Sequence, residues 1–223
     1  MSAGAILDRE MARLYEEISH LPWFCRTFSL AGRHPEMLPV CTRLYDNHLT
    51  DSSCPHLASG IRNNQTLRTL NLSRNNLKGP HFRDLMEALT TSRIEKLELY
   101  NNHLTDSSCL HLASGIRNNQ TLRTLNLYGN NLEGPHFRDL MEALTTSWIE
   151  KLQLSSNHLT DSSCPHLASG IRNNQTLRTL DLSGNNLEGP QFRDLMEALT
   201  TSRIEELQEN GWVQRPQFPA PVY

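Results

Sequence analysis

The chain has 223 residues, of which 37% are hydrophobic and 20% are charged, and its formal net charge is −3. This length fits one or two globular domains. The mildly acidic balance excludes the strongly basic surface with which proteins attract nucleic acid or an anionic membrane. No window holds the ~18 consecutive apolar residues that a membrane span requires. We therefore expect neither a nucleic-acid partner nor a membrane partner.

Residues 1–38 predict a cap that precedes a repeated region. Ile6, Leu7, Met11, Leu14 and Ile18 fall on one helical stripe, so we expect an amphipathic helix that covers the first strand of the region that follows. The segment has neither the basic nor the apolar part of a secretory signal, and an odd number of cysteines argues against a disulfide framework. Both features predict a cytoplasmic protein.

Residues 39–208 are built from one repeated unit. The string Leu-Thr-Asp-Ser-Ser-Cys begins at Leu49, Leu104 and Leu159, so the period is 55 residues. Each unit divides into halves of 27 and 28 residues that carry the pattern L-x-x-L-x-L-x-x-N-x-L. Complete matches occur at 67–77, 94–104, 122–132, 149–159 and 177–187. With a decayed first copy at 39–66, the region holds about six repeats.

Each half of the unit predicts a short strand followed by a helix. Leu70 and Leu72 alternate and point to one face of a strand, and Asn75 at the strand exit can satisfy backbone groups where the chain bends. Apolar residues recur with helical spacing over 82–89 and 109–116. We expect an α/β solenoid, a right-handed horseshoe arc with a parallel concave sheet and outer helices.

Polar residues mark the start of the predicted helices. Asp106 or Ser107 is expected to cap the helix at 109–116, and no matched base or oxyanion donor makes this serine a nucleophile. At the other end, residues 209–223 are rich in proline and predict a disordered tail. The last helix is then left without a polar cap, and self-association through this open end is one interpretation.

The alternating halves LRTLNLSRNNLKGPHFRDLMEAL and IEKLELYNNHLTDSSCLHLASGIRNNQT resemble the ribonuclease-inhibitor-like class of leucine-rich repeats. The phrase LTDSSC, followed by a helix, NNQT and LRTLNLS, is similar to the repeat regions of vertebrate NOD-like receptors. Tropomodulin-type and Ran GTPase-activating proteins share similar repeats. The resemblance covers about residues 40–208 and implies ligand sensing or regulation in innate immunity. The sequence lacks the G-x-x-x-x-G-K-[ST] loop of a NACHT region, so we expect no cofactor.

Differences between the internal copies locate candidate binding residues. Ten positions differ between the complete copies, and six of them are non-leucine positions of the strand or its exit, which face the concave surface or its rim. Aromatic residues and arginine contribute much of the energy of protein interfaces. The candidate partner-binding residues are Arg74, Glu98, Tyr100, Asn101, Tyr128, Trp148 and Asp181. Drift at tolerant surface positions explains the same pattern equally well, and Trp148 can also be a packing residue at a turn.

Charged residues and cysteines recur with the repeats. Arg68 and Glu95 occupy equivalent positions of adjacent strands, so we expect a ladder of surface ion pairs worth ~0–1 kcal/mol each, although a charged recognition surface is an alternative. Cys54-Pro55-His56 and its copies suggest a metal site. Residues i and i+2 do not share a helix face, and the copies lie roughly 10 Å apart. We therefore expect buried free thiols and no metal.

These features favour a non-catalytic protein–protein interaction module, because a preformed concave sheet loses little entropy on binding. The alternative is an enzyme regulator, either an inhibitor of the ribonuclease-inhibitor type or a GTPase activator that uses an arginine such as Arg74. A third interpretation, a consensus-like engineered array, explains the near-identical copies, but the irregular ends favour natural duplication.

Overall fold

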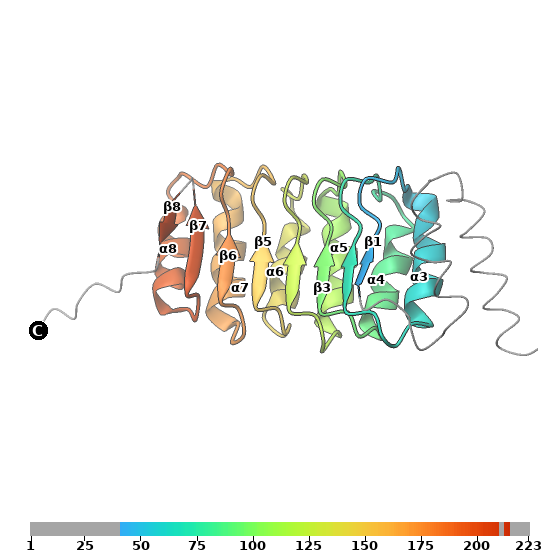
Figure 1. Cartoon of the computed structure of the whole chain (residues 1–223). Helices are drawn as coiled ribbons and strands as arrows, with labels where there is room; N and C mark the ends of the chain where they lie inside the picture. Colours follow the sequence, from blue (N-terminus) through green and yellow to red (C-terminus); the bar gives the residue numbers. More distant parts are fainter. Residues whose placement is uncertain (1–40, 210–211, 215–223) are drawn as a thin grey trace, which may run out of the picture.

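The computed structural model describes residues 41–209 and 212–214. Within this part of the chain, a row of strands lies in front of a row of helices (Figure 1). The helix predicted within residues 1–38 and the Pro-rich residues 215–223 lie outside the described residues. No helix of the described part is both long enough and apolar enough to cross a bilayer.

The strands of the described residues form a single sheet in sequence order. Neighbouring strands from β1 to β7 are parallel, and only β8 runs antiparallel to its neighbour. The strands are β1 (Cys41–Arg43), β2 (Thr69–Asn71), β3 (Lys96–Glu98), β4 (Thr124–Asn126), β5 (Lys151–Gln153), β6 (Thr179–Asp181), β7 (Glu206–Glu209) and β8 (Trp212–Gln214).

One helix follows each strand from β1 to β6 and lies on the opposite side of the solenoid (Figure 1). The helices are α3 (Cys54–Arg62), α4 (Phe82–Thr90), α5 (Asp106–Arg117), α6 (Phe137–Leu144), α7 (Cys164–Asn173) and α8 (Phe192–Thr201). Short 3-10 turns, η2 (Asp51–Ser53) and η3 (Asp161–Ser163), precede α3 and α7. The predicted alternation of strand and helix, and with it the leucine-rich-repeat solenoid, is confirmed.

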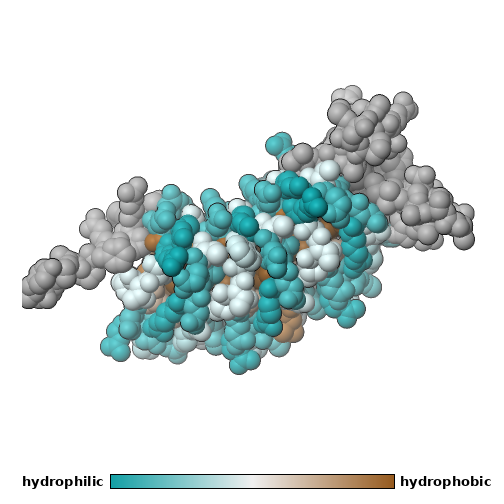
Figure 2. Space-filling model, turned by 90° about the horizontal axis from the view of Figure 1, so that it is seen from below, coloured by the Kyte–Doolittle hydropathy of each residue, from teal (hydrophilic) through white to brown (hydrophobic). Residues whose placement is uncertain are grey.

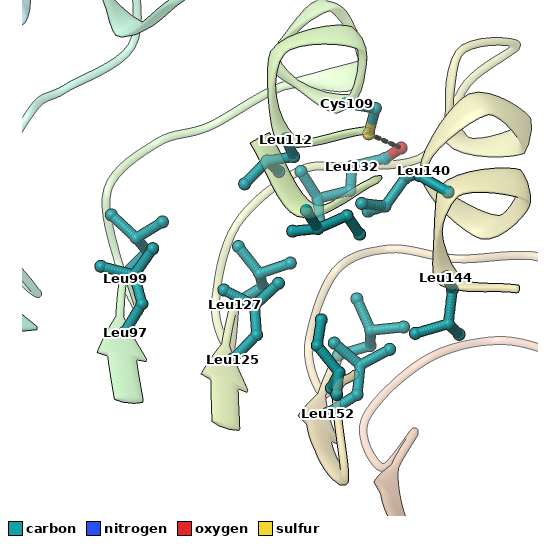
Figure 3. Packing of buried hydrophobic residues seen from close by; sticks show 14 of the residues in the cluster. Leu97, Leu99, Cys109, Leu112, Leu125, Leu127, Leu132, Leu140, Leu144 and Leu152 are labelled. Atoms are coloured by element: carbon teal, nitrogen blue, oxygen red, sulfur yellow. Dashed lines mark hydrogen bonds between the residues drawn. The ribbon is translucent and has the colours of Figure 1, made fainter. Parts of the chain in front are cut away.

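The leucines of neighbouring strands stand side by side. Leu97 pairs with Leu70 on one side and with Leu125 on the other, and all three are buried. Figure 3 shows that the strand leucines point toward the helix layer, which contributes Leu112 and Leu140 to the same core. Helices pack 8–10 Å apart and strands only about 4.8 Å apart, so the strand side of a solenoid is the shorter, concave side.

The asparagines at the exits of β2, β4 and β6 satisfy the backbone as predicted. The side-chain oxygen of Asn130 accepts hydrogen bonds from the backbone N–H groups of Asn102 and Leu104, each at 3.0 Å. Its amide donates to the carbonyl oxygens of Leu99 and Leu127, at 3.1 and 2.8 Å. The same kinds of bonds are formed by Asn75 and Asn185. These residues replace the ladder bonds that end where the chain leaves the sheet.

The prediction that Asp106 or Ser107 caps its own helix is wrong. Thr105 is the N-cap residue of α5 and forms a capping box with the serine three residues later. The Asp106 carboxylate instead accepts hydrogen bonds from the backbone N–H groups of His136 and Phe137, at 2.8 and 3.1 Å, where α6 begins. Because α6 belongs to the next repeat, this carboxylate joins two repeats.

The end of the sheet differs from the predicted disordered tail at 209–223. Strand β7 includes Glu209, and β8 pairs antiparallel with it, so that Leu207 lies opposite Gln214. A further parallel strand would need a long crossover connection, whereas the two residues between β7 and β8 allow only a hairpin. The sheet therefore ends on a reversed strand rather than on another repeat.

Candidate protein-interaction surface

The surface of β1–β7 that points away from the helices is the sheet face. Side chains alternate along each strand: on β3, Leu97 points into the core, whereas Lys96 is exposed on the sheet face. The same alternation continues past the strand, so that Tyr100 follows buried Leu99 at the strand exit. A row of such exit positions runs along one edge of the sheet face.

Two tyrosines stand together in this row. The ring centroids of Tyr100 and Tyr128 are 6.4 Å apart and the rings are tilted by 52°, a separation and tilt typical of favourable aromatic pairs. The side chain of Tyr128 is 42% exposed, and Tyr100 is partly exposed. The equivalent residues of the other complete copies are serines. The pair is therefore specific to the middle of the solenoid.

Arg74 and Asn101 lie on the rim beside the two tyrosines. The backbone N–H of Arg74 donates to the carbonyl oxygen of Tyr100, and that of Asn101 donates to the carbonyl oxygen of Tyr128, each at 2.9 Å. Both rim residues have positive φ angles, 56° and 51°, in the left-handed region that residues other than glycine rarely adopt. These four residues, Arg74, Tyr100, Asn101 and Tyr128, are the tyrosine cluster.

The structure adds one aromatic residue that the sequence comparison missed. Tyr45 follows buried Leu44 in the first repeat, as Tyr100 follows Leu99, and its side chain is 42% exposed. It therefore belongs to the same row of exit positions. The first repeat has decayed, so a comparison of complete copies left Tyr45 out. Its position directly after Leu44, a leucine of the repeat pattern, could have identified it.

Glu98 and Asp181 lie on the sheet face, but their carboxylates are bonded within the protein. Buried Glu98 accepts hydrogen bonds from the ammonium of Lys96 at 2.8 Å and from the amide of Asn126 at 2.7 Å. Buried Asp181 accepts from the hydroxyls of Ser155 and Ser183, at 2.9 and 2.7 Å. These partners explain how carboxylates are tolerated in buried positions. Neither carboxylate is part of the tyrosine cluster, and Asp181 lies three strands from Glu98.

Trp148 lies at the other end of the strands, in the turn between α6 and β5. Its side chain is 49% exposed, and the guanidinium of Arg123 lies 5.2 Å from the ring centroid, within the range of a cation–π contact. Trp148 is therefore a surface residue, separate from the tyrosine cluster.

Most of the described surface seen from below Figure 1 is hydrophilic, with only small hydrophobic areas (Figure 2).

The predicted ladder of arginine and glutamate is confirmed. Arg68 pairs with Glu95 on the next strand at 3.3 Å. The equivalent pairs, each at 3.4 Å, are Arg123–Glu150 and Arg178–Glu205. The glutamates are well exposed, so these pairs contribute ~0–1 kcal/mol each.

The three repeat-related cysteines are buried and unpaired, as predicted. Burial raises the pKa of Cys54 to about 12 and that of Cys164 to about 11, and it also raises the pKa of Cys109. Each remains a neutral thiol at physiological pH, which is a poor metal ligand and nucleophile. Within residues 41–209 and 212–214, no three His, Cys, Asp or Glu side chains are grouped as a metal site requires.

Comparisons with known proteins agree with this fold. Leucine-rich repeat family models match residues 63–80, 121–142 and 173–190. Ribonuclease inhibitor from Sus scrofa is 35% identical over 183 residues, which are 78% of this chain and 40% of the inhibitor. NACHT, LRR and PYD domains-containing protein 13 from Homo sapiens is 28% identical, over 93% of this chain and 21% of that protein. NACHT, LRR and PYD domains-containing protein 5 from Bos taurus is 32% identical, over 86% of this chain and 17% of that protein. The chain therefore spans less than half the length of these relatives.

A solved structure supports the architecture. The tropomodulin C-terminal domain from Caenorhabditis elegans matches with a TM-score of 0.50 and 22% identity, covering 69% of this chain and 93% of that domain. This likeness concerns the fold alone. The repeat register, the family models and the relatives agree: the chain is a leucine-rich repeat protein of the ribonuclease-inhibitor-like type.

Proposed function

We propose that the chain is a non-catalytic protein-interaction module that binds a protein through the tyrosine cluster. The observation that carries this proposal is the pair of adjacent, partly exposed rings of Tyr100 and Tyr128, where the other complete copies have serine. Tyrosine gives a large contact area with few rotatable bonds and a hydroxyl that can hydrogen bond at the edge of an interface. The rim residues Arg74 and Asn101 add donors beside the rings.

The rigidity of the strands below supports the same proposal. The two tyrosines follow β3 and β4, whose leucines are buried and whose exits are held by the asparagine bonds. A partner therefore meets residues that are already ordered, which lowers the entropic cost of binding. Glu98 contributes indirectly, since its bonds to Lys96 and Asn126 order side chains of β3 and β4, the strands that precede the two tyrosines.

The relatives extend the proposal to cellular context. The NACHT, LRR and PYD domains-containing proteins support a receptor-type role in ligand sensing or regulation, and the buried, unpaired cysteines suit the reducing cytoplasm. The resemblance to NOD-like receptors supports a role in innate immunity.

The ribonuclease inhibitor relatives favour a second candidate, an enzyme regulator. A net charge of −3 gives only weak attraction to a basic nuclease, so we rank this candidate below a general interaction module. Titration of a pancreatic-type ribonuclease with the chain tests it directly, and undiminished nuclease activity at saturating concentrations removes it. An unchanged GTPase rate in a panel of small GTPases removes the activator form, in which Arg74 would act.

The test is quantitative affinity capture from cell lysate with the wild-type chain and with the Tyr100→Ala, Tyr128→Ala double variant. We expect recovery of a specific partner to fall at least about tenfold, since truncation of an interface anchor costs about 1–2 kcal/mol or more. Leu110→Ser is the matched control, because Leu110 is equally exposed (42%) but lies on α5 in the helix layer. Partners retained by the tyrosine variant, or lost equally with the control, contradict the proposal.

A further inference from the structure

The last helix of the row exposes residues that its copies bury. Helices α4, α6 and α8 share the sequence FRDLMEAL, and Met86 and Met141 are 1% and 2% exposed. The equivalent Met196 of α8 is 38% exposed, and Phe192 is only partly buried. In Figure 1, α8 is the last helix at the red end of the row. One side of α8 is thus an apolar face without a neighbouring helix among the described residues.

The helices that cover the equivalent faces of α4 and α6 show which kind of helix fits this face. Helix α5 lies against α4, and α7 lies against α6. A Cβ atom added at Gly115 would lie 3.0 Å from the Met86 carbonyl oxygen, and one at Gly170 would lie 2.9 Å from that of Met141. Glycine therefore lets the covering helix come close to the backbone beneath it.

The covering segment also brings a fixed set of polar contacts. The amide of Asn119 donates to the Leu89 carbonyl oxygen at 2.6 Å, and the hydroxyl of Thr121 is 3.2 and 3.0 Å from the carbonyl oxygens of Ser92 and Ile94. Asn174 and Thr176 repeat these contacts after α7. The equivalent carbonyl groups at and after the end of α8 belong to Leu199, Ser202 and Ile204. Within the described residues, none of them receives a hydrogen bond from a following Asn or Thr.

We propose that the exposed face of α8 is a second docking site, which binds an amphipathic helix of a partner protein. The occupant carries small and apolar residues at helical spacing, a glycine above the Met196 carbonyl group, and an Asn-x-Thr sequence after the helix. A second copy that continues the solenoid head to tail does not fit, because β7 already occupies the place in the sheet that the second copy's β1 would need beside β6. The site is separate from the tyrosine cluster, so either proposal can fail alone.

The chain's own covering segment supplies the probe. A fluorescent peptide of residues 106–121, with its helix stabilised by a side-chain link between positions 110 and 114, keeps every contact described above, because both linked positions are exposed in α5. Added to the full chain, it should raise fluorescence polarisation saturably. The matched control peptide carries Gly115→Leu and should bind at least about tenfold more weakly, since its side chain would meet the backbone of α8.

The protein variant for this test is Met196→Glu. It should weaken peptide binding at least about tenfold while the far-UV circular dichroism spectrum and Tm stay close to wild type, because Met196 is already partly exposed. Three results would overturn the proposal: no saturable binding of the linked peptide, equal binding of the Gly115→Leu peptide, or unchanged binding to a folded Met196→Glu chain. Sedimentation that shows wild-type dimers, lost in Met196→Glu, would also overturn it, because the occupant would then be a second copy.

Discussion

A carboxylate from each 55-residue unit reaches into the next repeat. Asp106 accepts hydrogen bonds from the first backbone N–H groups of α6, and Asp161 does the same for α8. Gly134 makes this contact possible, since a Cβ there would lie only 2.4 Å from the Asp106 Cγ atom. The Gly-Pro pair before each such helix is thus explained by the approach of the aspartate as much as by the turn.

Removal of this carboxylate should weaken the join between repeats. We expect Asp106→Ala to lower the free energy of unfolding by about 1–2 kcal/mol, because the His136 N–H at the start of α6 loses its acceptor and the Phe137 N–H keeps only the Gly134 carbonyl oxygen. Urea denaturation followed by circular dichroism measures this change. Ser107→Ala is the control: Ser107 is exposed and its hydroxyl contacts only Thr105. Equal stability of the two variants would show that solvent replaces the aspartate fully.

At the scale of elements, two near-identical helices begin differently. Before α7, the Glu133 carboxylate accepts hydrogen bonds from the hydroxyls of Thr160 and Ser162, each at 2.8 Å, and from Ser163. Before α5, Lys78 occupies the position equivalent to Glu133, and Thr105 forms a capping box within its own turn. Helix α7 therefore gains an acceptor from the preceding repeat that α5 lacks.

This difference predicts opposite effects at the two equivalent positions. Lys78→Glu should stabilise the chain, and Glu133→Lys should destabilise it, each by about 0.5–2 kcal/mol, the range for a helix N-terminal acceptor. Chemical denaturation of both variants measures the changes. Glu188→Lys is the matched control, because no helix follows β7 in the described part of the chain. A destabilising Lys78→Glu would contradict the proposed equivalence.

The same carboxylate gives a pH signature. Burial acts to raise the pKa of Glu133, but the hydrogen bonds from Ser163, Ser162 and Thr160 outweigh it and leave the pKa below its ordinary value of 4.5. A carboxylate whose pKa is lowered on folding stabilises the protein above its unfolded pKa, and this stabilisation is lost as the pH falls through the folded-state pKa. The stability gap between wild type and Glu133→Gln should therefore be full at neutral pH and close in acid.

The limits of sequence-based prediction follow from the distances that separate partners along the chain. Leu70, Asn75 and the Arg68–Glu95 pair sit at fixed places in a known repeat, so their contacts could be predicted from the pattern alone. The bonds of Asp106 and Glu98 join residues about one repeat apart, and they depend on a register that only the stacked structure provides. Tyr45 was missed for a different reason: its repeat has lost part of the leucine pattern by which the complete copies were aligned.

At the scale of the whole molecule, every repeat contacts only its neighbours, as a solenoid requires. Deletion of residues 95–149 removes one complete unit and joins Ile94 to Glu150. Strand β2 would then meet β5 through Thr69 and Lys151, as Thr124 of β4 does now, and α4 would take the place of the identical α6 beside α7. No new type of interface is created.

We expect this shortened chain to fold cooperatively, with a urea m-value lower by about a quarter to a third because less surface is buried. It also loses Tyr100, Asn101 and Tyr128, so the proposed partner should no longer bind it. Urea denaturation and partner capture measure the two effects. A folded shortened chain that still captures the partner would exclude the tyrosine cluster as the binding site.

Deletion of residues 95–122 is the matched control, because it removes half a unit and joins Ile94 to Arg123. Helix α4 would then pack on α6, which has bulkier residues than α5 at the contact: Ala143 stands where α5 has Gly115, and Met141 where it has Ala113. Steric crowding against the Met86 carbonyl should make this chain less stable than the full-unit deletion, although it retains more residues. If the half-unit deletion is the more stable of the two, the alternation of two helix types is not what joins the repeats, and the occupant proposed for α8 loses its physical basis.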